Sequence, residues 1–254
     1  MRKTVLLVLS SILVVAFASS AWAQFINGGF ETGDFTGWTK NGGYWYGGIG
    51  TYNYTGDPGK SAIVTPGLDP IVGHINQVYS GNYAARVNDG DSYYTGWGGY
   101  HFSTISQSVV WTEPNIYFAW AAVLEEPGHD HDHEPHFYLT LTDDTTNTTL
   151  YNVLYASDTI PASLLNTVYI PQTGDDWKYT DWQVVNLDTS AVEGDTLTLT
   201  LLAADCGYGG HSGYVYLDGF GAAPPSPSVP EPATFFLFGT GITGFGLLRR
   251  KLRK

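Results

Sequence analysis

Two short segments of the chain alternate strictly between apolar and polar residues. Residues 196–201 read Thr-Leu-Thr-Leu-Thr-Leu, and residues 137–142 repeat the pattern with Phe, Leu and Leu at the apolar positions. Because successive side chains of a β-strand point to opposite faces, each segment predicts a strand with one buried face. Between residues 24 and 229 no stretch sustains an apolar period of 3.6 residues, so we expect no helix there.

Segments rich in β-branched and aromatic residues predict further strands at 83–87, 104–111, 150–155, 182–187 and 213–220. The run 116–124 is apolar on both faces, which is typical of a central strand that is covered on both sides. Turn residues such as Asn88-Asp89-Gly90 separate the strands. Antiparallel strands without helices between them exclude a parallel α/β sheet and predict an all-β antiparallel β-sandwich of the jelly-roll type.

The N-terminus has the three parts of a secretory signal peptide. Arg2 and Lys3 precede an apolar run over residues 5–18, and residues 19–23 end in an Ala-x-Ala cleavage site. This run is shorter than the ~20 residues that span a bilayer as a helix, which favours a signal peptide over an N-terminal anchor. We expect signal peptidase to cut after Ala23.

A second apolar run, residues 233–248, is followed at once by a basic end that includes Arg249 and Arg250. Basic residues stay on the cytoplasmic side, so we expect a short transmembrane helix that enters from outside and stops there. The run is short for a full span and contains four glycines. It therefore predicts a temporary hold on the membrane rather than a firm anchor.

The tripeptide Pro230-Glu231-Pro232 stands directly before this run. In this order and spacing, Pro-Glu-Pro, an apolar segment and an Arg-rich end resemble the PEP-CTERM tail of exosortase substrates. The resemblance covers residues 229–254. It implies that a membrane exosortase cuts near Pro230 to Pro232 and that the body reaches the cell surface or extracellular matrix. An ordinary C-terminal anchor is the alternative if the tail is never cut.

These ends predict the domain limits. Residues 1–23 form the signal peptide, 24–223 the β-sandwich domain, 224–229 a stiff Pro/Ser linker and 230–254 the sorting tail. Between the signal and the tail, four basic residues stand against 23 acidic ones. Such a surface repels nucleic acid and favours divalent cations, although solubility alone also explains the acidity.

Short blocks of the body resemble carbohydrate-binding, galactose-binding-like jelly rolls. Asn27-Gly28-Gly29-Phe30-Glu31, followed by Gly37-Trp38, resembles the first strand of that family, and 81–87, 105–109 and 213–220 resemble later blocks. The resemblance implies a structural calcium ion held by Glu31 and Asp218, with carbonyls of loop 81–83 and waters completing the shell. The alternative is that Glu31 caps a turn and Asp218 is an exposed edge acid.

A loop between two predicted strands is rich in histidine. His129, His131, His133 and His136 lie within eight residues and are interleaved with acidic residues. Imidazole is a good ligand for zinc, copper or nickel, so these four histidines are candidate transition-metal ligands. A solvated acidic loop without metal is the alternative, because the tract is compositional and contains no His-Glu-x-x-His motif.

Cys206 is the only cysteine, so no disulfide forms within the chain. Its thiol is either buried or open to intermolecular pairing. His211 follows five residues later, a spacing that would suit a nucleophile and its base. The glycines between them more simply indicate a tight bend.

Aromatic residues gather in Gly-rich segments that we expect to be loops, and Trp45, Tyr46, Trp97 and Tyr100 are candidate sugar-stacking rings. The alternative is that these rings cover the hydrophobic core where regular structure is missing. We therefore expect a non-enzymatic exported protein that binds exopolysaccharide, with calcium as its expected cofactor. The alternatives are a structural or adhesive matrix protein without a specific ligand, and a metal-dependent or glycoside hydrolase, for which no motif singles out a carboxylate pair.

Overall fold

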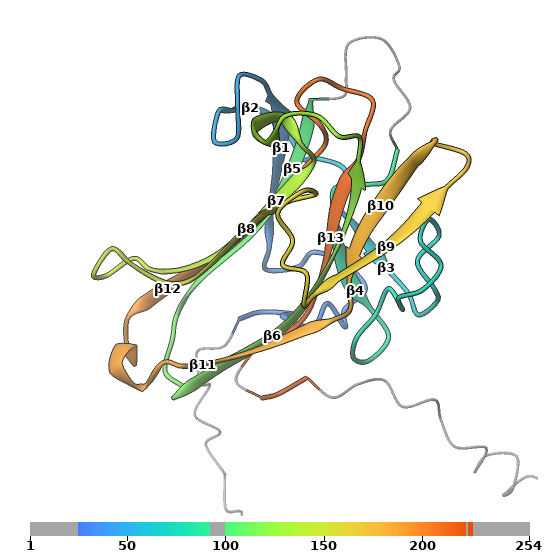
Figure 1. Cartoon of the computed structure of the whole chain (residues 1–254). Helices are drawn as coiled ribbons and strands as arrows, with labels where there is room; N and C mark the ends of the chain where they lie inside the picture. The colour runs from blue at the N-terminus through green and yellow to red at the C-terminus, as the bar shows by residue number, and fades with distance from the viewer. Residues whose placement is uncertain (1–24, 92–99, 222, 226–254) are drawn as a thin grey trace, which may run out of the picture.

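The structure is a computed structural model that describes residues 25–91, 100–221 and 223–225. Two antiparallel sheets face each other (Figure 1). The strands of the first sheet are β1 (Thr39–Trp45), β2 (Tyr52–Asp57), β5 (His101–Val110), β7 (His136–Asp143), β8 (Thr148–Ala156) and β12 (Thr196–Ala204). Those of the second are β3 (Ala62–Val64), β4 (Ala84–Val87), β6 (Asn115–Glu126), β9 (Leu165–Ile170), β10 (Asp175–Thr180), β11 (Gln183–Asp188) and β13 (Gly213–Gly221).

The connections wrap the two sheets around one core. The first sheet has the order β2-β1-β5-β12-β7-β8, and the second has the order β3-β4-β13-β6-β10-β9, with β11 also paired to β6. Successive strands from β4 to β7 cross from one sheet to the other, as in a jelly roll. This arrangement confirms the predicted antiparallel β-sandwich. The helical turns of the described residues are His131–His133 and Ser190–Val192, and no described helix is long and apolar enough to cross a membrane.

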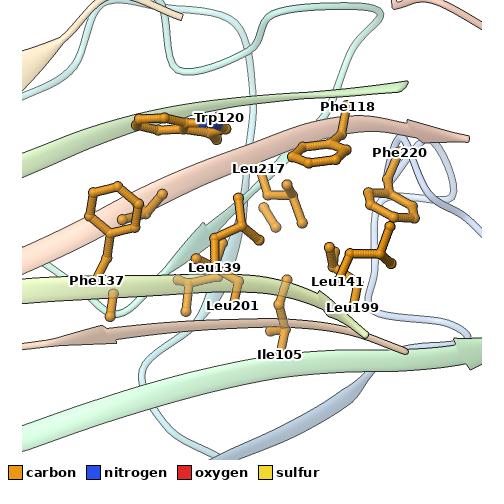
Figure 2. Packing of buried hydrophobic residues seen from close by; sticks show 14 of the residues in the cluster. Ile105, Phe118, Trp120, Phe137, Leu139, Leu141, Leu199, Leu201, Leu217 and Phe220 are labelled. Carbon is orange, nitrogen blue, oxygen red and sulfur yellow. The ribbon is translucent and has the colours of Figure 1, made fainter. Parts of the chain in front are cut away.

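The two alternating segments supply the centre of the core. Leu197, Leu199 and Leu201 of β12 are fully buried, and they pair in register with β7, whose own apolar residues point to the same side. Figure 2 shows Leu199 and Leu201 on the side of the core that faces Phe118 and Trp120 of the opposite sheet. The threonines of β12 lie on the other face and are half-buried. The alternation therefore predicted both the strands and the buried face correctly.

Strand β6 is buried on both faces, as its apolar run predicted. Its even-numbered residues, such as Phe118 and Trp120, join the core between the sheets. Its odd-numbered residues Ala121 and Val123 pack in a second cluster with Val72 and other buried side chains. Residues 65–81 form no strand and lie over this outer face. The sequence therefore predicted that β6 was covered but did not identify the loop that covers it.

Two expectations about the N-terminal third of the body were wrong. Residues 25–38 form turns rather than a first strand, and the aromatic segment that follows forms strands β1 and β2 rather than loops. Gly42 and Gly43 mark an irregularity in the β1–β2 register. A Cβ atom on Gly43 would overlap the carbonyl oxygen of Asn53, so close approach of two backbones requires glycine there. Because these glycines interrupt the run of apolar and β-branched residues, the sequence pattern did not predict strand β1.

Candidate functional site

The two candidate calcium ligands come together around one loop. Asp218 lies on β13, and Glu31 lies in the opening turns. Backbone N–H groups of the loop donate to both carboxylates: Tyr79 (3.0 Å) and Ser80 (2.8 Å) to Oδ2 of Asp218, and Asn82 (2.9 Å) and Tyr83 (3.2 Å) to Oε1 of Glu31. The resemblance implied that this loop presents carbonyl oxygens to an ion. In the structure, the N–H groups of the loop hold the two carboxylates in place, and carbonyl ligation of an ion stays a prediction.

Asp218 is a buried acid, not the exposed edge acid of the alternative interpretation. Its side chain is fully buried, and its Oδ1 has no hydrogen-bond partner among the described atoms. Burial raises the pKa of Asp218 from 3.8 to about 7, and the nearby charge of Glu31 also raises it. A Cβ atom on Gly29 would lie 3.9 Å from both Asp218 Oδ1 and Glu31 Cγ, so both side chains face one glycine. An unpartnered buried oxygen beside a second carboxylate fits a calcium ion.

A hollow of about 500 Å³ lies where β1, β2 and β5 meet. It is lined by Gly43, Tyr44, Tyr46, Thr55, Asp57, Tyr100 and His101. The side chains of Tyr44 and Tyr46 are 42% and 62% exposed. Their rings are almost parallel, with an interplanar angle of 12° and a centroid distance of 6.1 Å. The hollow therefore carries an exposed aromatic platform beside polar groups.

The polar side of the hollow includes an imidazole held by the fold. Nδ1 of His101 lies 3.0 Å from Oδ1 of Asn88. Burial lowers the pKa of His101, and the positive charge of Lys60 lowers it further. At neutral pH, this ring is therefore neutral and both donates and accepts hydrogen bonds.

The four candidate sugar-binding rings differ in where the structure places them. Tyr46 and Tyr100 line the hollow, while Trp97 lies outside the described residues. Trp45 is completely buried, and its Nε1 donates a hydrogen bond to the carbonyl oxygen of Asp205 at 3.1 Å. The prediction for Trp45 was wrong because Tyr44, Trp45 and Tyr46 follow the alternation of a strand, so the middle ring points to the opposite face.

The four candidate histidines, three in the loop between β6 and β7 and His136 at the start of β7, do not converge on one point, which corrects the expectation of a shared metal site. His131 pairs with Asp158, with Nδ1 3.0 Å from Oδ1. His133 contacts Asp130 and stacks on Tyr208 with a centroid distance of 4.1 Å. His136 is fully buried between Tyr52 and Glu134, and burial lowers its pKa to about 4. Three of the four therefore have separate partners.

His129 instead meets two residues from another loop. One ligand atom each of His129, Cys206 and His211 lies within 4.8 Å of the other two, and this is the one such group of three found among the described residues. Cys206 is fully buried, and burial raises the pKa of its thiol to about 11. The thiol is thus closed to a second chain in the folded protein. The sequence showed the His-rich loop and the Cys-Gly segment but gave no sign that they touch.

The residues of the predicted sorting steps, Ala23, Pro230, Glu231, Pro232, Arg249 and Arg250, lie outside the described residues. The family model of the PEP-CTERM protein-sorting motif matches residues 228–251. This match confirms the sorting signal predicted from the Pro-Glu-Pro tripeptide, the apolar run and the basic end. The motif indicates an exported, exosortase-sorted surface protein associated with a membrane.

No curated protein matches the chain. Among solved structures, TmCBM61 in complex with β-1,4-galactotriose is similar at 14% identity, covering 78% of this chain and 95% of that chain with a TM-score of 0.40. CBM27-1 of Caldicellulosiruptor saccharolyticus in complex with mannohexaose is similar at 12% identity, covering 66% and 84% with a TM-score of 0.34. Tailspike protein 4 of bacteriophage CBA120 is similar at 8% identity, covering 77% and 20% with a TM-score of 0.36.

By its own topology and tail, the chain is an antiparallel β-sandwich protein that carries a PEP-CTERM sorting motif. The similarity of the solved structures assigns no ligand to it. What this protein binds has to be argued from the hollow and the carboxylate pair.

Proposed function

We propose that the protein is a non-enzymatic component of the cell surface or extracellular matrix that binds exopolysaccharide in the hollow between β1, β2 and β5. The stacked, exposed pair of Tyr44 and Tyr46 carries this proposal. Aromatic faces pack on the apolar C–H faces of sugar rings, and two nearly parallel rings offer places for neighbouring sugar units. Exposed rings of this size have no role in the core of the sandwich.

The polar groups of the hollow suit sugar hydroxyls. Asp57 accepts hydrogen bonds, and Nε2 of the neutral imidazole of His101 accepts them as well, because its Nδ1 donates to Oδ1 of Asn88. The volume of about 500 Å³ falls within the ~300–1,000 Å³ that is usual for ligand sites. Together with the tyrosine rings, these groups give the mixed apolar and polar lining that a saccharide requires.

Binding without turnover is the favoured activity. A glycoside hydrolase needs two carboxyl groups about 5–9.5 Å apart on either side of the scissile bond. Among the described residues that line the hollow, Asp57 supplies the single carboxylate. We therefore propose a binding function rather than hydrolysis.

We further propose that Glu31 and Asp218 hold a calcium ion that stabilises the sandwich. The support is the buried Oδ1 of Asp218, which has no partner among the described atoms, and the neighbouring carboxylate of Glu31. When bound, the ion would neutralise the negative charges of the two carboxylates and would have no catalytic role. It would join the opening turns, loop 79–83 and the end of β13.

Affinity electrophoresis of the purified protein tests the glycan proposal. Gels would contain exopolysaccharide from the producing bacterium, with dextran gels as the control. We expect retardation by the exopolysaccharide and a Kd about tenfold higher for Tyr44→Ala or Tyr46→Ala, equivalent to ~1.4 kcal/mol. Tyr169→Ala is the matched control, because Tyr169 is 58% exposed on β9 and lies outside the hollow.

Equal retardation of all three variants would contradict the assignment of the hollow. No retardation of the wild type in any polysaccharide gel would favour a structural matrix protein without a specific ligand. Release of reducing sugar from the exopolysaccharide would overturn the non-enzymatic part of the proposal.

A further inference from the structure

Two loops meet at the end of the sandwich beyond β6 and β12, near the top of Figure 1. One is the β6–β7 connection, which carries His129, and the other is the β12–β13 connection, which carries Cys206 and His211. The backbone N–H of Gly207 donates to the carbonyl oxygen of His133 at 2.7 Å and joins the loops. The hydroxyl of Tyr208 donates to Oδ2 of Asp130 at 2.6 Å and joins them again. The loops therefore have a defined relative position.

Hydrogen bonds within the second loop bring its two candidate ligands close together. The N–H of Cys206 donates to the carbonyl oxygen of His211 at 2.8 Å, and the N–H of Gly209 donates to the carbonyl oxygen of Cys206 at 3.0 Å. Gly209 and Gly210 have φ values of +84° and +89°, which favour glycine. The chain thus turns back on itself and places the thiol and the imidazole side by side.

One hydrogen-bond donor points at the sulfur and would support a thiolate bound to a cation. Cys206 is fully buried, and its Sγ accepts a hydrogen bond from the N–H of Tyr208 at 3.3 Å. Such N–H donors stabilise negative charge on sulfur. The burial also argues against a nucleophile, because a substrate has no path to the sulfur in this fold.

His211 has the arrangement of a ligand supported by a carboxylate. Its Nε2 lies 3.8 Å from Oδ2 of Asp175. Its Nδ1 is buried and has no hydrogen-bond partner among the described atoms. In metal sites, one imidazole nitrogen binds the ion while the other faces a carboxylate, which fixes the ring and its tautomer. Nδ1 is therefore available as the ligand atom.

We propose that His129, Cys206 and His211 form a three-ligand site for a transition-metal ion of the zinc or copper class. Two imidazoles and one thiolate are the donors that these ions prefer. Around such an ion, tetrahedral ligand atoms lie about 3.3–3.6 Å apart, given bond lengths of ~2.0–2.3 Å. The present spread of 4.8 Å or less needs only a small closure of side chains. Three ligands leave a fourth position open, and none of the three lines the proposed glycan hollow.

Titration of the purified, metal-free protein with Co²⁺ tests the proposal, because a thiolate bound to cobalt gives a charge-transfer absorption in the near ultraviolet. We expect one equivalent of Co²⁺ to produce this band, and Zn²⁺ to displace it. Cys206→Ser should abolish the band. His129→Gln and His211→Gln should weaken binding by about 100-fold or more, and Asp175→Asn by ~10-fold through loss of the supporting carboxylate.

His131→Gln is the matched control, because His131 belongs to the same His-rich loop but pairs with Asp158. It should bind Co²⁺ as the wild type does. Equal weakening by His131→Gln and His129→Gln would overturn the proposal in favour of non-specific binding by the loop. An unchanged band in Cys206→Ser would overturn it as well. Near-ultraviolet circular dichroism of each metal-free variant shows whether a loss reflects the ligand or the fold.

A parallel titration with Cu²⁺ separates the two ions. Copper bound to the thiolate gives an intense visible band, whereas zinc gives none. A lower Kd for Zn²⁺ assigns a zinc site, and a stable visible band that Zn²⁺ does not displace assigns a copper site. Failure of Zn²⁺, Co²⁺ and Cu²⁺ to bind stoichiometrically would end the proposal.

Discussion

Gly81 lies against the carboxylate of Glu31 so closely that a Cβ atom on Gly81 would overlap Oε1. The same carboxylate accepts the N–H groups of Asn82 and Tyr83. A side chain at position 81 would therefore push Glu31 out of the position that the loop gives it.

The first prediction follows from this contact. Gly81→Ala should lower the free energy of unfolding by about 1–2 kcal/mol, of which ~1 kcal/mol is backbone strain at φ +72° and the rest is lost hydrogen bonding at the exposed Glu31. Urea denaturation of the variant and the wild type measures this difference in unfolding free energy. Gly73→Ala is the control, because Gly73 has a similar φ of +69° but a Cβ atom there would meet no described atom within 4 Å. Equal costs for the two variants would contradict the steric argument.

The second prediction concerns calcium and pH. Because the pKa of Asp218 is higher in the folded chain than 3.8, the folded state holds the proton more tightly. Without calcium, this carboxyl therefore destabilises the fold as pH rises from 3.8 towards about 7. Calcium binds the ionised form. At saturating calcium, we expect Tm to rise by about 5–10 °C at pH 8 and by much less at pH 5.

Asp218→Asn is the variant that isolates this carboxyl, since Glu125 and Glu134 also have pKa values raised to about 7 by burial. The amide does not titrate and carries no negative charge, so the calcium-dependent rise in Tm should become much smaller and no longer differ between the two pH values. Differential scanning calorimetry with calcium and with chelator gives the comparison. The same rise in variant and wild type would exclude Asp218 as a ligand.

The third prediction separates buried from exposed rings at the end of β1. Trp45→Ala should cost about 3–5 kcal/mol of unfolding free energy, because it removes a fully buried indole. Tyr46→Ala should change it by less than ~0.5 kcal/mol, because this ring is exposed. Thermal and urea unfolding decide between the two roles. A stable Trp45→Ala protein that no longer binds glycan would show that Trp45 is a binding ring and not a core residue.

The fourth prediction concerns the loop that covers β6. Oδ2 of Asp69 accepts the hydroxyl groups of both Tyr214 and Tyr216 at 2.7 Å. Asp69→Ala leaves two buried donors without this acceptor and should cost ~3 kcal/mol, whereas Tyr216→Phe should cost ~1.5 kcal/mol. The double variant should cost less than the sum, since both remove the same bond. If the unfolding free-energy losses of the two single variants add up to that of the double variant, the hydrogen bond between Asp69 and Tyr216 contributes nothing to stability.

Much of the fold could be predicted because its central strands bury one or both faces completely. That burial requires the alternating pattern of β7 and β12 and the long apolar run of β6, so these patterns predict the strands. Strand β9, at the edge of the second sheet, and its neighbour β10 were missed because they include many polar or incompletely buried positions. Strands β1 and β2 were missed because glycine replaces side chains where their backbones approach.

The candidate sites were harder to predict because they join segments far apart in the chain. The sequence named Glu31 and Asp218, and the structure places both around loop 79–83. It also marked the His-rich loop and Cys206 separately. Only the strand order brings the β6–β7 and β12–β13 connections to the same end, so the pairing of His129 with Cys206 depends on topology rather than on any local pattern.

Strand β13 connects the end of the sandwich that carries the hollow to the point where the chain leaves the sandwich. This strand runs from Gly213, beside the loop whose Asp205 contacts His101 of the hollow, to Gly221, where the chain leaves the sandwich (Figure 1). Its nine residues span ~30 Å. The hollow and the point where the chain leaves the sandwich therefore lie near opposite ends of this strand, so a partner that held the chain beyond Gly221 would not cover the tyrosine rings.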